Sequence, residues 1–187
     1  MGKAVMAAMA ALVCWACVAA QAAPLRLPAS KESVAQGGSV TAAAQGALIR
    51  YRGWLLAVDG AASDERPDVL LRSAEAGQAP QLQIGSTQRA LPLWSAFELV
   101  KGNARLRITA LPGPDEVAAL LLDFGDGDYR IVIPASGIAR QAYPLLAQRF
   151  PGADLALLLQ DGRRVMLPLG SGSAQVFGAE QAVPYRF

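Results

Sequence analysis

Short apolar runs separated by turn residues dominate the chain beyond its N-terminal segment. Runs of this length, broken by Gly, Asn, Asp and Pro, are typical of β-strands rather than of helices. Two connections have the composition of tight hairpin turns, Arg52-Gly53 and Lys101-Gly102-Asn103. We therefore expect a β-rich domain with strands at residues 39–43, 47–51, 54–58, 69–71, 81–84, 96–100, 105–110, 117–124, 129–133, 153–159 and 164–167.

Residues 69–71 form a continuously apolar run, and residues 117–124 and 153–159 are apolar apart from Asp123 and Asp154. They lack the alternation of apolar and polar positions that marks a half-exposed strand. A continuous apolar run predicts a strand that is buried on both faces. We therefore expect these strands in the interior of the molecule.

Residues 139–150 are the best candidate for a helix. Pro144 fits only its first turn, where the missing N–H costs no hydrogen bond, and Pro151-Gly152 ends it. The expected apolar face has the spacing of a helix that packs on a core. It is made by Ile138, Ala142, Leu145, Leu146 and Phe150.

The N-terminus has the pattern of a secretory signal peptide. Lys3 supplies a positive charge, an Ala-rich apolar stretch follows, and residues 20–22 offer a small-x-small cleavage site. The apolar stretch is too short and too rich in Ala for a good membrane span, so we expect no stable span after cleavage. The alternative is that the segment is not cleaved and remains as an N-terminal anchor. The expected organisation is a signal peptide at 1–22, a linker at 23–38 and one domain at 39–187, in a periplasmic or secreted protein.

The composition excludes several kinds of chemistry. The chain has no histidine, and both cysteines, Cys14 and Cys17, lie in the leader. The mature chain therefore lacks the usual zinc ligands, a thiol nucleophile and any Ser-His-Asp triad. Its 17 Lys and Arg against 15 Asp and Glu give no general attraction to nucleic acid. We expect no cofactor, no bound metal and no nucleic-acid partner.

Five segments share a pattern that extends over the chain from about residue 39 to residue 168. They are GALIRYRGWLLAVD at 46–59, DVLL at 68–71, LRITALP at 106–112, the strand pair at 120–133 and RFPGADLALL at 149–158. These segments, in this order, resemble the metallo-β-lactamase superfamily. The resemblance implies an α+β fold, the αββα sandwich of two β-sheets between helices, here truncated and β-rich. The alternative is a secreted all-β sandwich with an accidental likeness.

The metal ligands of that family do not carry over. Where the family has T-H-x-H-x-D-H, this chain has RSAEAGQ at residues 72–78. Pro114 and Asp115 stand near the position of the next histidine, and PASG at 134–137 replaces the Ser-Gly-Asp-Thr turn. One carboxylate with hydroxyls and an amide cannot hold two zinc ions at useful affinity.

Glu75, Asp115 and Ser136 are the candidate site residues, because the resemblance implies that they converge. Together they would line a remnant pocket for Ca²⁺, Mg²⁺ or a small polar ligand. The alternative is that all three are solvent-exposed loop residues.

Three other polar features have simpler interpretations. Asp59 at a strand end fits a turn-forming role. Arg163-Arg164 fits a solvated charge pair in a turn. GDGD at residues 125–128 predicts a hairpin turn rather than a Ca²⁺ loop, because it lacks the further carboxylates of such a loop.

Two functional hypotheses follow. The first is a non-catalytic, exported member of the metallo-β-lactamase fold that binds an unknown protein or a small polar ligand, or acts as a scaffold. The second is a hydrolase of ester, lactone or phosphoester type that uses Glu75 or Asp115 as a base or as a Mg²⁺ ligand.

Overall fold

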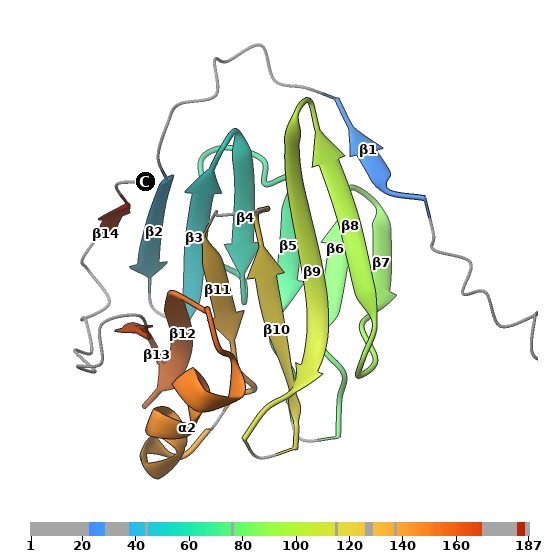
Figure 1. Ribbon diagram of the computed structural model, residues 1–187. Helices are drawn as coiled ribbons and strands as arrows, with labels where there is room; N and C mark the ends of the chain where they lie inside the picture. Colours follow the sequence, from blue (N-terminus) through green and yellow to red (C-terminus); the bar gives the residue numbers. More distant parts are fainter. Residues whose placement is uncertain are drawn as a thin grey trace, which may run out of the picture.

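The computed structural model describes residues 23–28, 38–43, 45–75, 77–114, 116–125, 129–136, 138–169 and 183–185. They form two seven-stranded β-sheets that face each other (Figure 1). Sheet A has the order β1 (Leu25–Leu27), β8 (Ala96–Lys101), β9 (Ala104–Pro112), β10 (Ala118–Asp123), β11 (Arg130–Ile133), β12 (Leu155–Gln160) and β13 (Arg163–Pro168). Sheet B has the order β14 (Val183–Tyr185), β2 (Gly38–Ala43), β3 (Gly46–Tyr51), β4 (Trp54–Val58), β5 (Val69–Arg72), β6 (Gln81–Ile84) and β7 (Thr87–Ala90).

The main core lies between the sheets. Sheet B contributes Trp54, Leu56 and Leu71, and sheet A contributes Leu106 and Leu120; all five side chains are essentially inaccessible to solvent. Burying apolar surface of this extent is the dominant favourable term in folding. The described residues include no cysteine, so this core does not depend on disulfides.

A second apolar layer covers the outer face of sheet A. A 3₁₀ turn (Arg140–Ala142) leads into α2 (Tyr143–Arg149), with Pro144 in the first turn as predicted. The buried side of α2, with Leu146 at its centre, packs on outward-facing residues of β11 and β12. The predicted burial of β10 and β12 on both faces is confirmed. Leu145, expected on the apolar face of the helix, is instead 46% exposed.

Strand β5 is not buried on both faces, so that prediction is wrong. Val69 and Leu71 face the core, but Leu70 is 36% exposed and Arg72 is exposed. On sheet B, the described residues include no helix that covers this outer face. A three-residue apolar run could not distinguish one buried face from two.

Two strands carry no clear sequence signal. Leu25–Leu27, within the expected linker, forms β1 and pairs in parallel with β8. Thr87–Ala90 forms β7, whose four residues are all exposed. Strand β7 is held by backbone pairing rather than by burial of its own side chains, whereas β1 also packs Leu27 against the main core.

The fold class is confirmed at its coarser level, as a β-rich pair of sheets. The described residues contain one short α-helix rather than the helical layers on both sides that an αββα sandwich implies. No helix within the described ranges is long and apolar enough to cross a membrane.

Two parallel strand pairs bring loops to one edge of the sandwich. Strands β4 and β5 run parallel in sheet B, and β11 and β12 run parallel in sheet A. Asp59 follows β4, Ser73 follows β5 and Ser136 follows β11. Because parallel strands end at the same edge of a sheet, Asp59 and Ser73 are neighbours, and Ser136 meets them from the other sheet.

Candidate functional site

A small polar pocket opens where these loops meet. Its volume is about 320 Å³. Two predicted site residues, Glu75 and Ser136, both line it, so the structure brings them together. The other polar side chains around it are Gln45, Asp59, Arg72, Ser73, Gln78 and Gln81. Asp115 and residues 126–128 lie outside the described residues.

Asp59 organises the floor of this pocket. Its Oδ1 accepts a hydrogen bond from the backbone N–H of Ser73 at 2.7 Å, and its Oδ2 accepts one from the Ser73 hydroxyl at 2.7 Å. The backbone of Asp59 has a positive φ of 48°, as expected for a turn-forming aspartate. Asp59 is therefore both a turn residue, as predicted, and the anchor of the loop after β5.

The partner of Asp59 is Arg164, on the opposite sheet. The Arg164 side chain is completely buried, and its guanidinium forms an ion pair with Asp59 Oδ2. The same guanidinium donates hydrogen bonds to the carbonyls of Gln45 and Leu157, at 3.1 Å each. The prediction that Arg164 is a solvated turn residue is wrong, whereas its neighbour Arg163 is exposed.

Burial and the ion pair act on Arg164 in opposite directions. Desolvation lowers the pKa of its guanidinium, while the charge of Asp59 and the hydrogen bond to it raise that pKa. An arginine pKa starts so high that the group stays protonated at physiological pH. A permanent buried cation therefore lies behind Asp59, one of the residues that line the pocket.

The serine hydroxyls connect the two sheets. Ser73 Oγ lies 3.1 Å from Ser136 Oγ, and the Ser136 N–H donates to the carbonyl of Ala74 at 2.9 Å. Ser73 is only 8% exposed. Both hydroxyls thus belong to a chain of hydrogen bonds that runs from Ser136 through Ser73 to Asp59.

Glu75 occupies the rim of the pocket. A local β-bridge joins it to Gln78, whose N–H donates to the Glu75 carbonyl at 2.9 Å. Gly77, between them, has a φ of +77°, which favours glycine in this tight loop. The Glu75 residue is exposed, so its carboxylate is available to a ligand.

No arrangement for a metal ion is found in the described part of the chain. Nowhere in it do three or more Asp, Glu, His or Cys side chains group closely enough to hold one. The Asp59 carboxylate accepts from Arg164 and from Ser73, which leaves Glu75 as the other carboxylate of the pocket.

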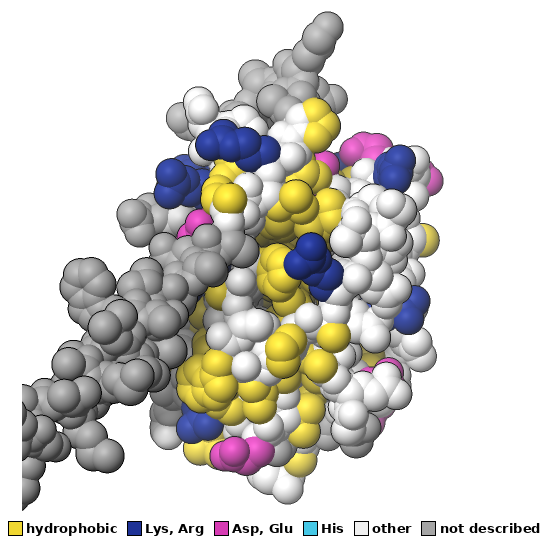
Figure 2. All heavy atoms as spheres, turned by 90° about the vertical axis from the view of Figure 1, so that its right-hand side faces the viewer, with side chains coloured by type: hydrophobic (Ala, Val, Ile, Leu, Met, Phe, Trp, Pro, Cys, Tyr) yellow, Lys and Arg dark blue, Asp and Glu magenta, His cyan; other side chains and the backbone are white. Residues whose placement is uncertain are grey.

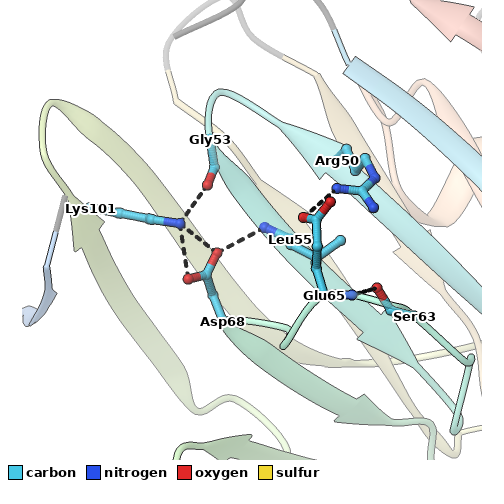
Figure 3. A network of polar contacts seen from close by, with 7 residues as sticks. All are labelled: Arg50, Gly53, Leu55, Ser63, Glu65, Asp68 and Lys101. Atoms are coloured by element: carbon cyan, nitrogen blue, oxygen red, sulfur yellow. Dashed lines mark hydrogen bonds and ion pairs between the residues drawn. The ribbon is translucent and has the colours of Figure 1, made fainter. Parts of the chain in front are cut away.

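A second cation links the sheets at the other end of β5 (Figure 3). Lys101, from β8, lies 2.8 Å from Asp68 Oδ2 and donates to the carbonyl of Gly53 at 2.6 Å. Asp68 Oδ2 also accepts the N–H of Leu55 at 2.9 Å. Asp59 and Asp68 therefore fix both ends of the β4–β5 connection, each with a cation from sheet A.

Local sequence contained one indication of the role of Arg164. Strand alternation places Arg164 on the same face of β13 as the buried Met166. The pairing with Asp59 was not predictable in this way, because the two residues are 105 positions apart.

No protein-family model, curated protein or solved structure matches the chain.

Proposed function

We propose that the chain is an exported, non-catalytic binding or scaffold module on a metallo-β-lactamase-type fold that has lost most of its helices. Support for the fold comes from the order of the resembling segments along the strands. The proposed absence of metal chemistry is supported by the polar pocket, where Arg164 pairs with Asp59 and the described residues form no cluster of metal ligands. The proposed export rests on the leader pattern of residues 1–22, which lie outside the described residues.

The ion pair between Arg164 and Asp59 is the observation that carries this proposal. A catalytic metal needs several ligands and an open coordination position. Here Arg164 already supplies the positive charge beside Asp59, and the carboxylate accepts hydrogen bonds from Ser73 as well. A divalent cation at Asp59 would have to displace the guanidinium or lie beside its like charge.

The free groups of the pocket fit a small polar ligand. Glu75 and Arg72 are exposed on its rim, with opposite charges, and Gln78 and Gln81 add amide donors and acceptors. Its volume of about 320 Å³ lies at the lower end of ligand pockets. A zwitterionic or amide-bearing molecule matches this lining better than an apolar one.

One observation favours a second candidate, a carboxylate-dependent hydrolase. Glu75 lines the same pocket as the hydroxyls of Ser73 and Ser136. A carboxylate can act as a general base on water, or bind Mg²⁺ together with hydroxyl oxygens. In such a hydrolase Glu75 would be essential, whereas in the binding module it would affect only ligand affinity.

A hydrolase screen separates the two candidates. The purified chain would be assayed with ester, lactone and phosphoester substrates in the presence of Mg²⁺. The matched variants are Glu75→Gln and Glu65→Gln, because Glu65 is exposed and pairs with Arg50 outside the pocket. We expect no turnover that depends on Glu75. Turnover that is lost in Glu75→Gln and retained in Glu65→Gln would establish the hydrolase instead.

A further inference from the structure

A larger cleft lies at the side of the sandwich away from the polar pocket. Its volume is about 970 Å³, and it shares no lining residue with that pocket. It opens between β1 and β8 of sheet A and β6 and β7 of sheet B. Figure 2 shows this side of the molecule, where hydrophobic side chains form a continuous band with Lys and Arg side chains beside it.

The floor of the cleft is an open edge of the main core. Leu82 is fully buried there, and Leu27, Ile84 and Phe97 pack against the core while remaining partly exposed. Leu25, on β1, is 48% exposed. An exposed apolar surface that is concave and continuous with the core is typical of a binding site for hydrocarbon.

The rim of the cleft is cationic. Arg26, Arg66, Arg89 and Arg107 line it, and none of them forms an ion pair with another described residue. All four are exposed. The rim is therefore rich in guanidinium groups with unused hydrogen-bonding capacity.

Few carboxylates offset this charge. The rim carries Asp68, which is neutralised by Lys101 at 2.8 Å, and Glu98, the cross-strand neighbour of Arg107. The Arg89 guanidinium carbon lies 5.5 Å from the centre of the Phe97 ring, so one cation stands directly above the apolar floor. The cleft thus combines hydrocarbon-binding walls with an anion-binding mouth.

We infer that this cleft binds a fatty acid of medium or long chain. The acyl chain would lie on Leu27, Ile84 and Phe97, and the carboxylate would accept hydrogen bonds from Arg89 and its neighbours. Arginine is suited to this role because its planar guanidinium binds carboxylates in a bidentate manner. A volume of about 970 Å³ is within the range of small-molecule sites, which favours an amphiphile over a protein partner.

Calorimetric titration of the purified chain with laurate, below its micelle-forming concentration, tests the inference. The chain must retain Leu25–Leu27, because this strand lines the cleft. We expect saturable binding of laurate, no detectable binding of butyrate, and at least about tenfold weaker binding of dodecyltrimethylammonium, which has a similar chain but a cationic head.

Two exposed arginines provide a matched pair of variants. Arg89→Ala should weaken laurate binding about tenfold, the effect of losing one charge-assisted hydrogen bond. Arg105→Ala, on β9 but outside the cleft, should leave it unchanged. Phe97→Asp, at the floor, should abolish binding. The inference is overturned if laurate does not bind, if the cationic amphiphile binds equally well, or if Arg105→Ala weakens binding as much as Arg89→Ala.

Discussion

Replacing Arg164 with methionine tests the ion pair at the polar pocket. Methionine keeps much of the apolar stem but removes every donor. The substitution leaves the Asp59 carboxylate without its cation and the carbonyls of Gln45 and Leu157 without the guanidinium donor. Arg164→Met should therefore destabilise the fold strongly, even though it adds no steric clash.

The magnitude follows from the burial of the two partners. Removing one member of a buried ion pair typically costs about 3–5 kcal/mol, because the other charge is left uncompensated. The Asp59 side chain is 19% exposed, whereas that of Arg164 is 0% exposed. Since water can reach part of the orphaned carboxylate, we expect the lower end of that range, about 3 kcal/mol.

Urea unfolding, followed by tryptophan fluorescence and circular dichroism, measures this change in the free energy of unfolding. Trp54 is buried in the main core and reports on its loss. The matched control is Arg163→Met, on the same strand but exposed, which should stay within about 0.5 kcal/mol of the wild type. A change below about 1 kcal/mol for Arg164→Met would refute the buried pair, since that is the size expected for a surface ion pair.

A double-mutant cycle separates the pair from the rest of the site. Asp59→Asn removes the negative charge but keeps an amide that can still contact Ser73. If the pair is formed, combining Asp59→Asn with Arg164→Met should cost clearly less than the sum of the two single changes. Strict additivity in the same urea experiment would show that the two charges do not interact.

Three further substitutions test other parts of the fold. Asp68→Asn should cost about 1–3 kcal/mol in urea unfolding, because it leaves the mostly buried charge of Lys101 unpaired; an unchanged midpoint would contradict this. Gly46→Ala should also cost about 1–3 kcal/mol, because the Cβ of the new alanine would lie 2.6 Å from the backbone nitrogen of Ala61. A variant as stable as the wild type would rule out this close contact. Burial raises the pKa of Tyr143 above 10.0, so the native state holds this proton more tightly than the unfolded state. The free energy of unfolding should therefore be independent of this group below that pH and decrease above it. In pH-dependent melting, Tyr143→Phe should reduce this alkaline decrease.

The interior strands were predictable because their composition follows from what they bury. Strands β10 and β12 contribute to the core on one face and to the layer under α2 on the other, so an apolar side chain is needed at nearly every position. Edge strands lack this constraint. Strand β7 exposes all four of its residues and β1 is three residues long, so neither has an apolar pattern to detect.

The candidate site was predictable only in part. Glu75 and Ser136 were selected from the family resemblance, and both line the pocket. The interaction that determines its chemistry, between Asp59 and Arg164, joins two sheets across 105 positions of sequence. Each residue alone has an ordinary local interpretation, as a turn former and as a solvated charge. Tertiary packing, rather than local pattern, decides that the arginine is buried.

The metal content of the purified chain tests the central claim most directly. The chain would be incubated with excess Zn²⁺, passed through a desalting column and analysed for zinc by mass spectrometry. Because Arg164 already neutralises Asp59 and no cluster of metal ligands is found among the described residues, we predict far less than one zinc per chain. One or two zinc ions per chain, retained after desalting, would contradict the account and indicate a metal-dependent site.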